Sequence, residues 1–472
     1  MNSQIQFQIE PADLMVELVA IVGEHRVKTD SEILYHWGKD QTHLFEPNPI
    51  AIVFPSNTEQ VQAIVKLAYQ YDLAVTPSGG RTGLSGGAVA KNGEIVISMD
   101  KMNQVIDFLP ADRMVRIQAG VVTEQLQNFA EEQGFYYPVD FASSGSSQIG
   151  GNIGTNAGGI KVIKYGMTRN WILGLTVVTA KGDILRLNKG MIKNATGYAM
   201  QHLFIGGEGT LGIVTEVDVR LDRQPQNLQA LVLGVPNFNA VMPILHEFRK
   251  QIDLTAFEFF NENSMRKVID CGHVHRPFET EAPFYILLEY EAPYEAIQDT
   301  AMQIFEYCLE QEWILDGVMS QSIEQLKNLW RLREDISESL SGYVTNKNDI
   351  SVLISHVPDF IQDIENHLTE NFPDFETCWF GHIGDGNLHL NILKPDNMEK
   401  EHFIQTCQHI NPEIFKIVQK YEGSISAEHG VGLTKKPYLS FSRSAEEIEY
   451  MRALKMVFDP KGIMNPGKII DV

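Results

Sequence analysis

The sequence has few cysteines, no long hydrophobic run and fewer basic than acidic residues. Only four cysteines occur among 472 residues, and none belongs to a C-x-x-C motif. Such spacing favours reduced thiols in a cytoplasmic protein over a disulfide framework. No stretch approaches the roughly 18 uninterrupted apolar residues of a membrane span. The opening MNSQIQFQIEPADLM also lacks the basic and apolar regions of a secretory signal, so we predict a cytoplasmic location.

The shortage of basic residues limits the possible partners. Asp and Glu number 61 against 38 Lys and Arg, which gives a formal net charge of −23. A nucleic-acid or anionic membrane surface needs a basic footprint, so neither partner is expected. A site for an anionic substrate must therefore gather its own positive charge. A soluble enzyme or binding protein fits these limits.

Hydrophobic patterning indicates a mixed α+β chain with several domains. The stretch PNPIAIVFPSNTEQVQAIVKLAYQYDLAVTPSGG reads as a strand, a helix capped by Ser56, Asn57 and Thr58, and a second strand ending in glycines. A β-α-β unit of this kind commonly places its glycine loop against a phosphate. The polar segment DRQPQNLQ then suggests a boundary, and we divide the chain at 1–224, 225–420 and 421–472.

Two glycine-rich loops stand far apart in the chain. The first is PSGGRTGLSGG at 77–87, with Arg81 as its charge, and the second is SGSSQIGGNIGTNAGG at 144–159. Neither is a Walker loop or a G-x-G-x-x-G motif. Glycine lets the backbone N–H groups approach an anion closely. A glycine-rich turn would explain one loop, but two loops favour a large dinucleotide held at two points.

The stretch GHIGDGNLHLNIL at 381–393 carries two histidines. Strand alternation places His389 and Asn391 on one face, and the glycines before them allow His382 to converge on His389. The later segment SAEHGVG adds Glu428 and His429. Two imidazoles and a carboxylate suit a divalent ion such as zinc. The alternative is a polar turn with a buried hydrogen-bond network.

The helical pattern LKNLWRLREDISESL carries a second polar group. Arg333 and Ser337 are four residues apart and are expected to share one helix face. Lys347 follows at the start of KNDISVLI. Taken alone, these residues would form a solvated basic face paired with Glu334 and Asp335.

The glycine loops carry a family resemblance. PSGGRTGLSGG and GGNIGTNAGGIKVIKYGMTRNWILGLTVVTAKGDIL resemble the FAD-binding domain of vanillyl-alcohol-oxidase type flavoproteins, within the branch that oxidises D-2-hydroxy acids. The resemblance runs from about residue 30 to NPGKI. It implies a two-subdomain FAD-binding domain at 1–224, an α+β substrate (cap) domain at 225–420 and a C-terminal helical segment at 421–472 that closes over the flavin. Some relatives attach the flavin through a histidine in the first loop. None lies between 77 and 87 here, so we expect non-covalent FAD.

The resemblance also implies roles for individual residues. The expected metal ligands are His382, His389 and Glu428, the general base is His429, and the substrate-binding residues are Arg333, Ser337, Lys347 and Asn391. Ser337 stands where the family often has threonine. The residues implied for FAD binding are Pro77, Gly79, Gly80, Arg81, Thr82, Gly83, Leu84, Ser85, Ser144, Gly145, Gly150, Gly151, Asn152, Gly154, Thr155, Asn156, Gly158, Gly159, Gly212, Ile213 and Asn465.

The implied reaction is oxidation of a 2-hydroxy acid. The flavin takes the hydride from C2, the metal acidifies the hydroxyl, and His429 removes its proton. Loss of the C2 proton first, through a carbanion, would use the same residues, and both routes stay open.

Three segments, IKVIKYGMTRNW, FGHIGDGNLHLNILKPD and KNDISV, resemble bacterial D-2-hydroxyglutarate dehydrogenases most. This implies oxidation of D-2-hydroxyglutarate, a by-product of serine biosynthesis, to 2-oxoglutarate. D-malate is an expected side substrate, and an electron-transfer flavoprotein or quinone is the expected acceptor. A D-lactate dehydrogenase or the flavin subunit of a glycolate oxidase is the alternative. A metal-dependent hydrolase or a pure binding protein would leave the glycine loops or His429 without a task. A homodimer is compatible with the sequence.

Overall fold

The computed structural model describes residues 9–472, so the first eight residues of the predicted 1–224 domain, and of the opening stretch read for a secretory signal, lie outside the described residues. The described residues form two compact units. Unit 1 contains the chain up to Gly158, then Met167–Gln224 and Glu428–Val472. Unit 2 contains Gly159–Gly166 and Pro225–Ala427.

Unit 1 begins with the predicted β-α-β arrangement. Its first sheet has the order β1-β2-β4-β3, in which β2 and β3 both pair with β4 in parallel. Helix α3 begins where the cap is predicted, because the Asn57 side chain accepts a hydrogen bond from the Gln60 backbone at 2.8 Å. The strands of this sheet are β1 (Val27–Lys28), β2 (Ala51–Val53), β3 (Val75–Ser78) and β4 (Ile95–Ser98).

A second sheet of unit 1 is antiparallel and has the order β5-β6-β10-β8-β9. Its strands, with the separate pair β7 and β11, are β5 (Val105–Leu109), β6 (Met114–Gln118), β8 (Ile172–Val178), β9 (Ile184–Leu187), β10 (Ile213–Arg220), β7 (Phe135–Tyr136) and β11 (Asp222–Arg223). The helices of unit 1 are α1 (Pro11–Val22), α2 (Ser31–Trp37), α3 (Thr58–Gln70), α4 (Thr123–Glu132), α5 (Ile149–Thr155), α7 (Gln201–Phe204) and α15 (Ala445–Phe458).

The first sheet of unit 1 is held by an apolar core. Leu14 and Leu18 lie four apart on α1 and are fully buried, as are Val61 and Val65 of α3. This spacing puts each pair on one helix face, which packs onto the apolar strands. The core fixes the end of β3, from which the first glycine loop leaves.

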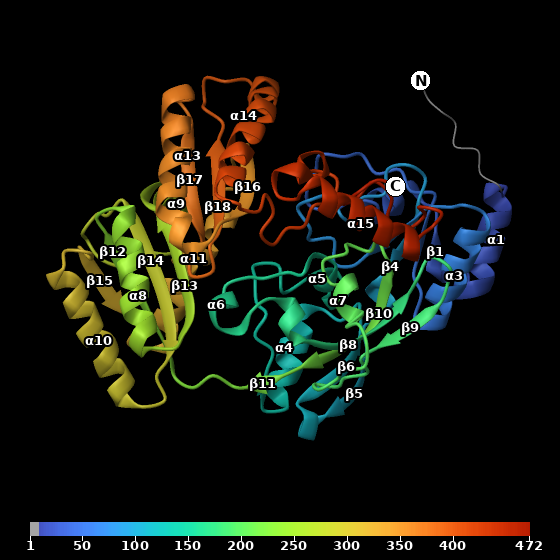
Figure 1. Cartoon of the computed structure of the whole chain (residues 1–472), viewed down its shortest axis with the longest axis horizontal. Coiled ribbons are helices and arrows are strands. Elements are labelled where there is room, and N and C mark those ends of the chain that lie inside the picture. The colour runs from blue at the N-terminus through green and yellow to red at the C-terminus, as the bar shows by residue number, and fades with distance from the viewer. Residues whose placement is uncertain (1–8) are drawn as a thin grey trace. The chain divides into compact units, whose positions relative to one another are not determined.

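Unit 2 is built on one seven-stranded antiparallel sheet with the order β15-β12-β14-β13-β17-β18-β16. Its strands are β12 (Leu228–Val235), β13 (Leu254–Asn261), β14 (Phe284–Glu291), β15 (Asp316–Met319), β16 (Thr345–Ser351), β17 (Glu376–His382) and β18 (Asn387–Leu393). Its helices, several of them visible over this sheet in Figure 1, are α6 (Val162–Tyr165), α8 (Val241–Gln251), α9 (Glu262–Asp270), α10 (Glu295–Glu310), α11 (Ile323–Glu334), α12 (Ile336–Ser339), α13 (Val357–Asn371) and α14 (Lys400–Lys420).

The eight residues Gly159–Gly166 belong to unit 2, although unit 1 flanks them on both sides. Two lysines hold this segment to β14. The Lys161 ammonium lies 2.5 Å from Glu289, and the Lys164 ammonium lies 2.7 Å from Glu291. Because Glu289 and Glu291 are two residues apart on a strand, they point to the same face. Lys161 and Lys164, three residues apart in the segment Gly159–Gly166, form their ion pairs on that face.

One predicted helix is interrupted. The pattern from Ile323 to Ser339 forms two helices, α11 and α12, with Asp335 between them. The Asp335 carboxylate lies 2.9 Å from the Arg331 guanidinium, and this ion pair stabilises the turn between the two helices. None of the helices in residues 9–472 is long and apolar enough to cross a bilayer. All four cysteines are free thiols, as predicted.

Candidate active site

The two glycine loops meet inside unit 1. A Cβ atom at Gly80 would lie 2.1 Å from the carbonyl oxygen of Ser146, and one at Gly79 would lie 3.5 Å from Gln148. No side chain fits between backbones so close together, which explains the glycine at position 80. Segments about 65 residues apart in sequence therefore form one wall, as expected for a ligand held at two points.

Asp100 ties the side chains around this wall together. Its carboxylate accepts hydrogen bonds from Trp37 Nε1 at 2.9 Å and from Gln148 Nε2 at 2.8 Å. Arg81, in the left-handed backbone region at φ 61°, lies 3.5 Å from the same carboxylate. The charge of Arg81 is therefore partly balanced by Asp100, and the Arg81 side chain acts here to hold the loop.

Several buried polar atoms at this wall have no protein partner among the described residues. They are Ser78 Oγ, Gln148 Oε1 and Asn465 Oδ1. Buried donors and acceptors are normally satisfied, so orphaned ones indicate a ligand. A Cβ at Gly151 of α5 would meet nothing within 4 Å, which leaves room beside them. This polar, glycine-lined surface fits a dinucleotide such as FAD.

Glu208 anchors the segment that carries His429. Its buried carboxylate accepts hydrogen bonds from the Val431 backbone at 2.6 Å and the Gly432 backbone at 2.8 Å. Asn465 donates to the Glu208 carbonyl at 2.7 Å and to the Gly87 carbonyl at 2.9 Å. Burial raises the pKa of Glu208 to about 7, although the two N–H donors oppose the rise. The segment 430–432, the first glycine loop and the C-terminal tail are thus joined around one carboxyl group.

The sheet of unit 2 collects the other predicted residues on one face. Across β16 and β18, Lys347 lies opposite Asn391 and Asp349 lies opposite His389. Directly opposed residues in an antiparallel pair point the same way, and residues two apart share a face. The predicted alternation of His389 and Asn391 is therefore confirmed, and it brings Lys347 and Asp349 to the same face.

His382 joins this group from the end of β17. Its ring centroid lies 5.3 Å from that of His389, so the two imidazoles converge as expected. His382 Nδ1 lies 3.0 Å and 2.8 Å from the two carboxylate oxygens of Glu258. Arg333 Nη2 lies 2.9 Å from Glu258 on the other side. All four residues are buried.

Both imidazoles present the same nitrogen to a carboxylate. Nδ1 of His382 faces Glu258, and Nδ1 of His389 lies 3.8 Å from Asp349. At His382 the carboxylate favours the Nδ1–H tautomer, which keeps the proton off Nε2, whereas the 3.8 Å separation at His389 is beyond hydrogen-bond distance. Two imidazoles beside carboxylates are compatible with a divalent ion, and Asp349 and His389 belong to a group of side chains that could hold one.

Glu428 and His429 begin the last segment of unit 1. They directly follow Ala427 of unit 2, whose backbone N–H donates to the Asp349 carbonyl at 3.3 Å. The Glu428 carboxylate and His429 Nε2 lie 4.0 Å apart.

The predicted substrate residues differ in their surroundings. Arg333 is buried, with its Cζ 4.9 Å from the Phe380 ring centre, and its Nε has no hydrogen-bond partner among the described residues. Ser337 is exposed on α12, beyond the break at Asp335, so Arg333 and Ser337 do not share one face of a continuous helix. Partial desolvation lowers the pKa of Lys347. Arg333 is thus a buried cation of unit 2, and Lys347 is an exposed one.

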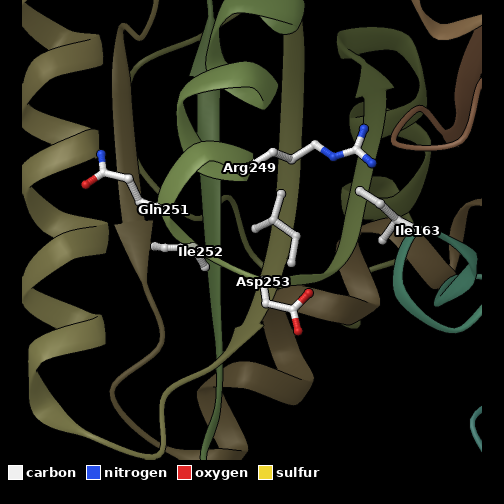
Figure 2. A pocket seen from close by; sticks show the side chains of 6 residues that line it. Ile163, Arg249, Gln251, Ile252 and Asp253 are labelled. Atoms are coloured by element: carbon white, nitrogen blue, oxygen red, sulfur yellow. The ribbon is translucent and has the colours of Figure 1, made fainter.

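A shallow hollow of about 330 Å³ elsewhere on unit 2 contains none of the predicted site residues. Figure 2 shows Arg249 and Asp253 among the residues that line it, together with Ile163 of the segment Gly159–Gly166. Asp253 lies 3.0 Å from Lys164, so this carboxylate already has a cation.

Glu208, Glu258 and Asp349 were not among the predicted site residues. Glu258 is a single acid within the apolar strand sequence LTAFEFFN, and such a residue needs a buried partner. A single acid in an apolar strand is therefore the feature of the sequence that could have identified Glu258. Glu208 and Asp349 carry no comparable signal, because each lies among other polar residues.

Comparison with protein families settles the cofactor. Residues 49–188 match an FAD binding domain, and residues 224–469 match the C-terminal domain of FAD linked oxidases. The chain belongs to the FAD-linked oxidases. The predicted FAD and the vanillyl-alcohol-oxidase type fold are confirmed. This FAD-linked oxidase is an oxidoreductase, as predicted.

Individual relatives agree with this family. D-2-hydroxyglutarate dehydrogenase of Stutzerimonas stutzeri is 61% identical over 460 residues, 98% of this chain and 99% of that protein. An enzyme of the same name from Xanthomonas citri pv. viticola is 49% identical over 97% of both chains. The crystal structure of p-cresol methylhydroxylase superposes with a TM-score of 0.79 over 98% of this FAD-linked oxidase and 97% of that chain, at 15% identity. That likeness concerns the fold alone.

Proposed function

We propose that this FAD-linked oxidase converts D-2-hydroxyglutarate to 2-oxoglutarate with the help of a divalent metal. The observation that carries the proposal is the set Lys347, Asn391, His389 and His382 on one sheet face, in a chain 61% identical to a D-2-hydroxyglutarate dehydrogenase. Two basic side chains near two imidazoles suit a dicarboxylate whose hydroxyl must lose a proton.

In this proposal the polar side chains divide the substrate between them. Arg333 and Lys347 bind carboxylates, since a guanidinium forms paired hydrogen bonds and an ammonium supplies a compact charge. Ser337 and Asn391 add neutral hydrogen bonds. His429 takes the proton from the 2-hydroxyl, because imidazole is the side chain that most often serves as a general base in proteins.

Two bound groups complete the chemistry. FAD, when bound along the glycine loops, accepts the two electrons released from C2. A divalent metal such as zinc, held by His382, His389 and Glu428, would acidify the substrate hydroxyl. The chain's own residues orient the acid and remove its proton. An electron-transfer flavoprotein or quinone would take up these electrons. D-malate would be a slower substrate, because its second carboxylate lies one carbon nearer.

An anaerobic visible spectrum tests the proposal. D-2-hydroxyglutarate should bleach the oxidised-flavin band near 450 nm (approximately, a property of flavins in general), and the product should be 2-oxoglutarate. D-lactate in a parallel sample should bleach it far more slowly. Bleaching by D-lactate alone would favour the lactate dehydrogenase alternative. A protein that stays fully oxidised with both acids would contradict the proposal.

A further inference from the structure

Glu258 lies between two groups that the proposed reaction uses. It is on β13, 1% exposed, and its two carboxylate oxygens lie within 3.0 Å of His382 Nδ1. One of them, Oε2, also forms an ion pair with Arg333 Nη2 at 2.9 Å, although the geometry of this pair is not that of a hydrogen bond. One buried anion therefore contacts both a predicted metal ligand and a predicted substrate ligand.

The fold sets this arrangement through strand register. On β13, Phe260 lies opposite Phe380 of β17, and Phe259 lies opposite Gly381. Continuing this antiparallel ladder brings Glu258 to the level of His382. Arg333 reaches the same point from the last turn of α11, with its guanidinium over the Phe380 ring. The contact thus depends on two rigid strands and one helix.

We propose that Glu258 is a positioning residue, which orients His382 for the metal and Arg333 for the substrate carboxylate. The inference rests on the proposed function and goes beyond it by assigning a role to a residue that touches neither metal nor substrate. A carboxylate that accepts Nδ1–H fixes the imidazole tautomer and ring angle, and it raises the basicity of Nε2. The same negative charge keeps the buried Arg333 guanidinium compensated before substrate binds.

Asp349 is the carboxylate of unit 2 that faces the second histidine, His389. It lies 3.8 Å from His389 Nδ1, beyond hydrogen-bond distance, and it accepts a hydrogen bond from Asn387 Nδ2 at 2.9 Å. Glu258, by contrast, has both oxygens against the imidazole. Of the two carboxylates, Glu258 therefore has the geometry to fix the tautomer and ring angle of its histidine, His382.

The test measures zinc affinity and turnover of the full-length, FAD-loaded protein. Glu258→Gln keeps the side-chain size and removes the charge. We expect zinc affinity, from competition with a chelating dye and zinc alone, to fall by about 10- to 100-fold. We also expect KM for D-2-hydroxyglutarate to rise, because Arg333 loses its fixed partner. Glu258→Asp, which keeps the charge on a shorter side chain, should lie between Glu258→Gln and the unchanged protein.

Glu289→Gln is the matched control. Glu289 is equally buried and lies on the neighbouring strand β14, where it pairs with Lys161 and accepts a hydrogen bond from Trp330. Its substitution should lower the melting temperature but leave zinc affinity unchanged. If Glu258→Gln fails to fold, Glu258→Asp decides the question through the same zinc titration.

The outcomes separate the inference from the proposed function. Unchanged zinc affinity and KM in both Glu258 variants would overturn the positioning role and leave the proposed function intact. Equal zinc loss in Glu289→Gln would also overturn it, because general destabilisation would then be the cause. If the wild-type protein takes up no zinc, the metal-dependent function and the inference are both overturned.

Discussion

At the scale of single residues, the acids in this chain do more than balance cations. Asp100, Glu208 and Glu258 are buried or half-buried, and each holds two or more groups in place. The donors and acceptors were predicted from motifs, but the acids that orient them were not. Glu258 is 124 residues from His382 in sequence, and only the pairing of β13 with β17 brings them together.

His429 provides the most direct residue-scale prediction. His429→Ala should lower turnover by roughly 10²- to 10⁴-fold, the usual contribution of a general base. The flavin should stay bound, because none of the predicted FAD contacts is removed. Steady-state rates and the flavin spectrum measure the two effects. His409→Ala, at an exposed histidine of α14, should leave both unchanged, and wild-type turnover in His429→Ala would exclude His429 as the base.

Glu208 predicts a pH dependence of stability. Its folded pKa of about 7 lies above the usual 4.5, so the folded protein binds this proton more tightly than the unfolded chain. The contribution of protonated Glu208 to the free energy of unfolding is therefore full below pH 4.5, and it is lost as pH rises through about 7.

The comparison is made between the unchanged protein and Glu208→Gln. The free energy of unfolding is measured with urea at pH 6 and at pH 8 for both proteins. Its decrease from pH 6 to pH 8 should be larger by about 1 kcal/mol in the wild-type protein than in Glu208→Gln. Equal losses in both proteins would contradict a titrating Glu208.

At the scale of elements, patterns predicted most of the local structure. The cap at Asn57, the alternation in β18 and the helix at the C-terminus all follow from local chemistry. The break at Asp335 did not, because the apolar spacing continues through it. Ser337 is consequently exposed while Arg333 is buried, and helical spacing alone cannot describe how they face a substrate.

The contact between the glycine loops makes an element-scale prediction. Gly80→Ala would place a methyl group 2.1 Å from the Ser146 carbonyl oxygen, so one backbone segment must move. We expect lower FAD content and a melting temperature reduced by several degrees (about 2–4 °C per kcal/mol). Absorbance ratios and thermal melts measure this. Gly342→Ala meets nothing within 4 Å and serves as the control. Full FAD content in Gly80→Ala would show that the loop adapts.

At the scale of the whole molecule, the chain enters unit 2 twice. The first visit, Gly159–Gly166, immediately follows the second glycine loop, and nothing in its composition marks it as belonging elsewhere. Its ion pairs with β14 and with Asp253 attach it to unit 2. Lys161 and Glu289 are 9% and 2% exposed, so their pairing is a buried one.

A double-mutant cycle measures this attachment. Lys161→Met and Glu289→Gln should each cost about 3–5 kcal/mol, because each leaves a buried charge unpaired. The double variant should cost less than the sum, with a coupling of about 0.5–3 kcal/mol. The exposed pair Arg443 and Glu447 is the control, for which coupling below about 1 kcal/mol is expected. Additive losses at Lys161 and Glu289 would show that the segment is held by other contacts.

The segment Gly159–Gly166 also limits how hybrids can be made between such enzymes. Replacing residues 225–427 with the corresponding stretch of a relative would bring a new β14 against an old Gly159–Gly166. Any relative lacking acids at the positions of Glu289 and Glu291 would leave two lysines without their anions. A working hybrid must therefore exchange both stretches together, so that eight residues from the cofactor half of the gene are inherited with the substrate half.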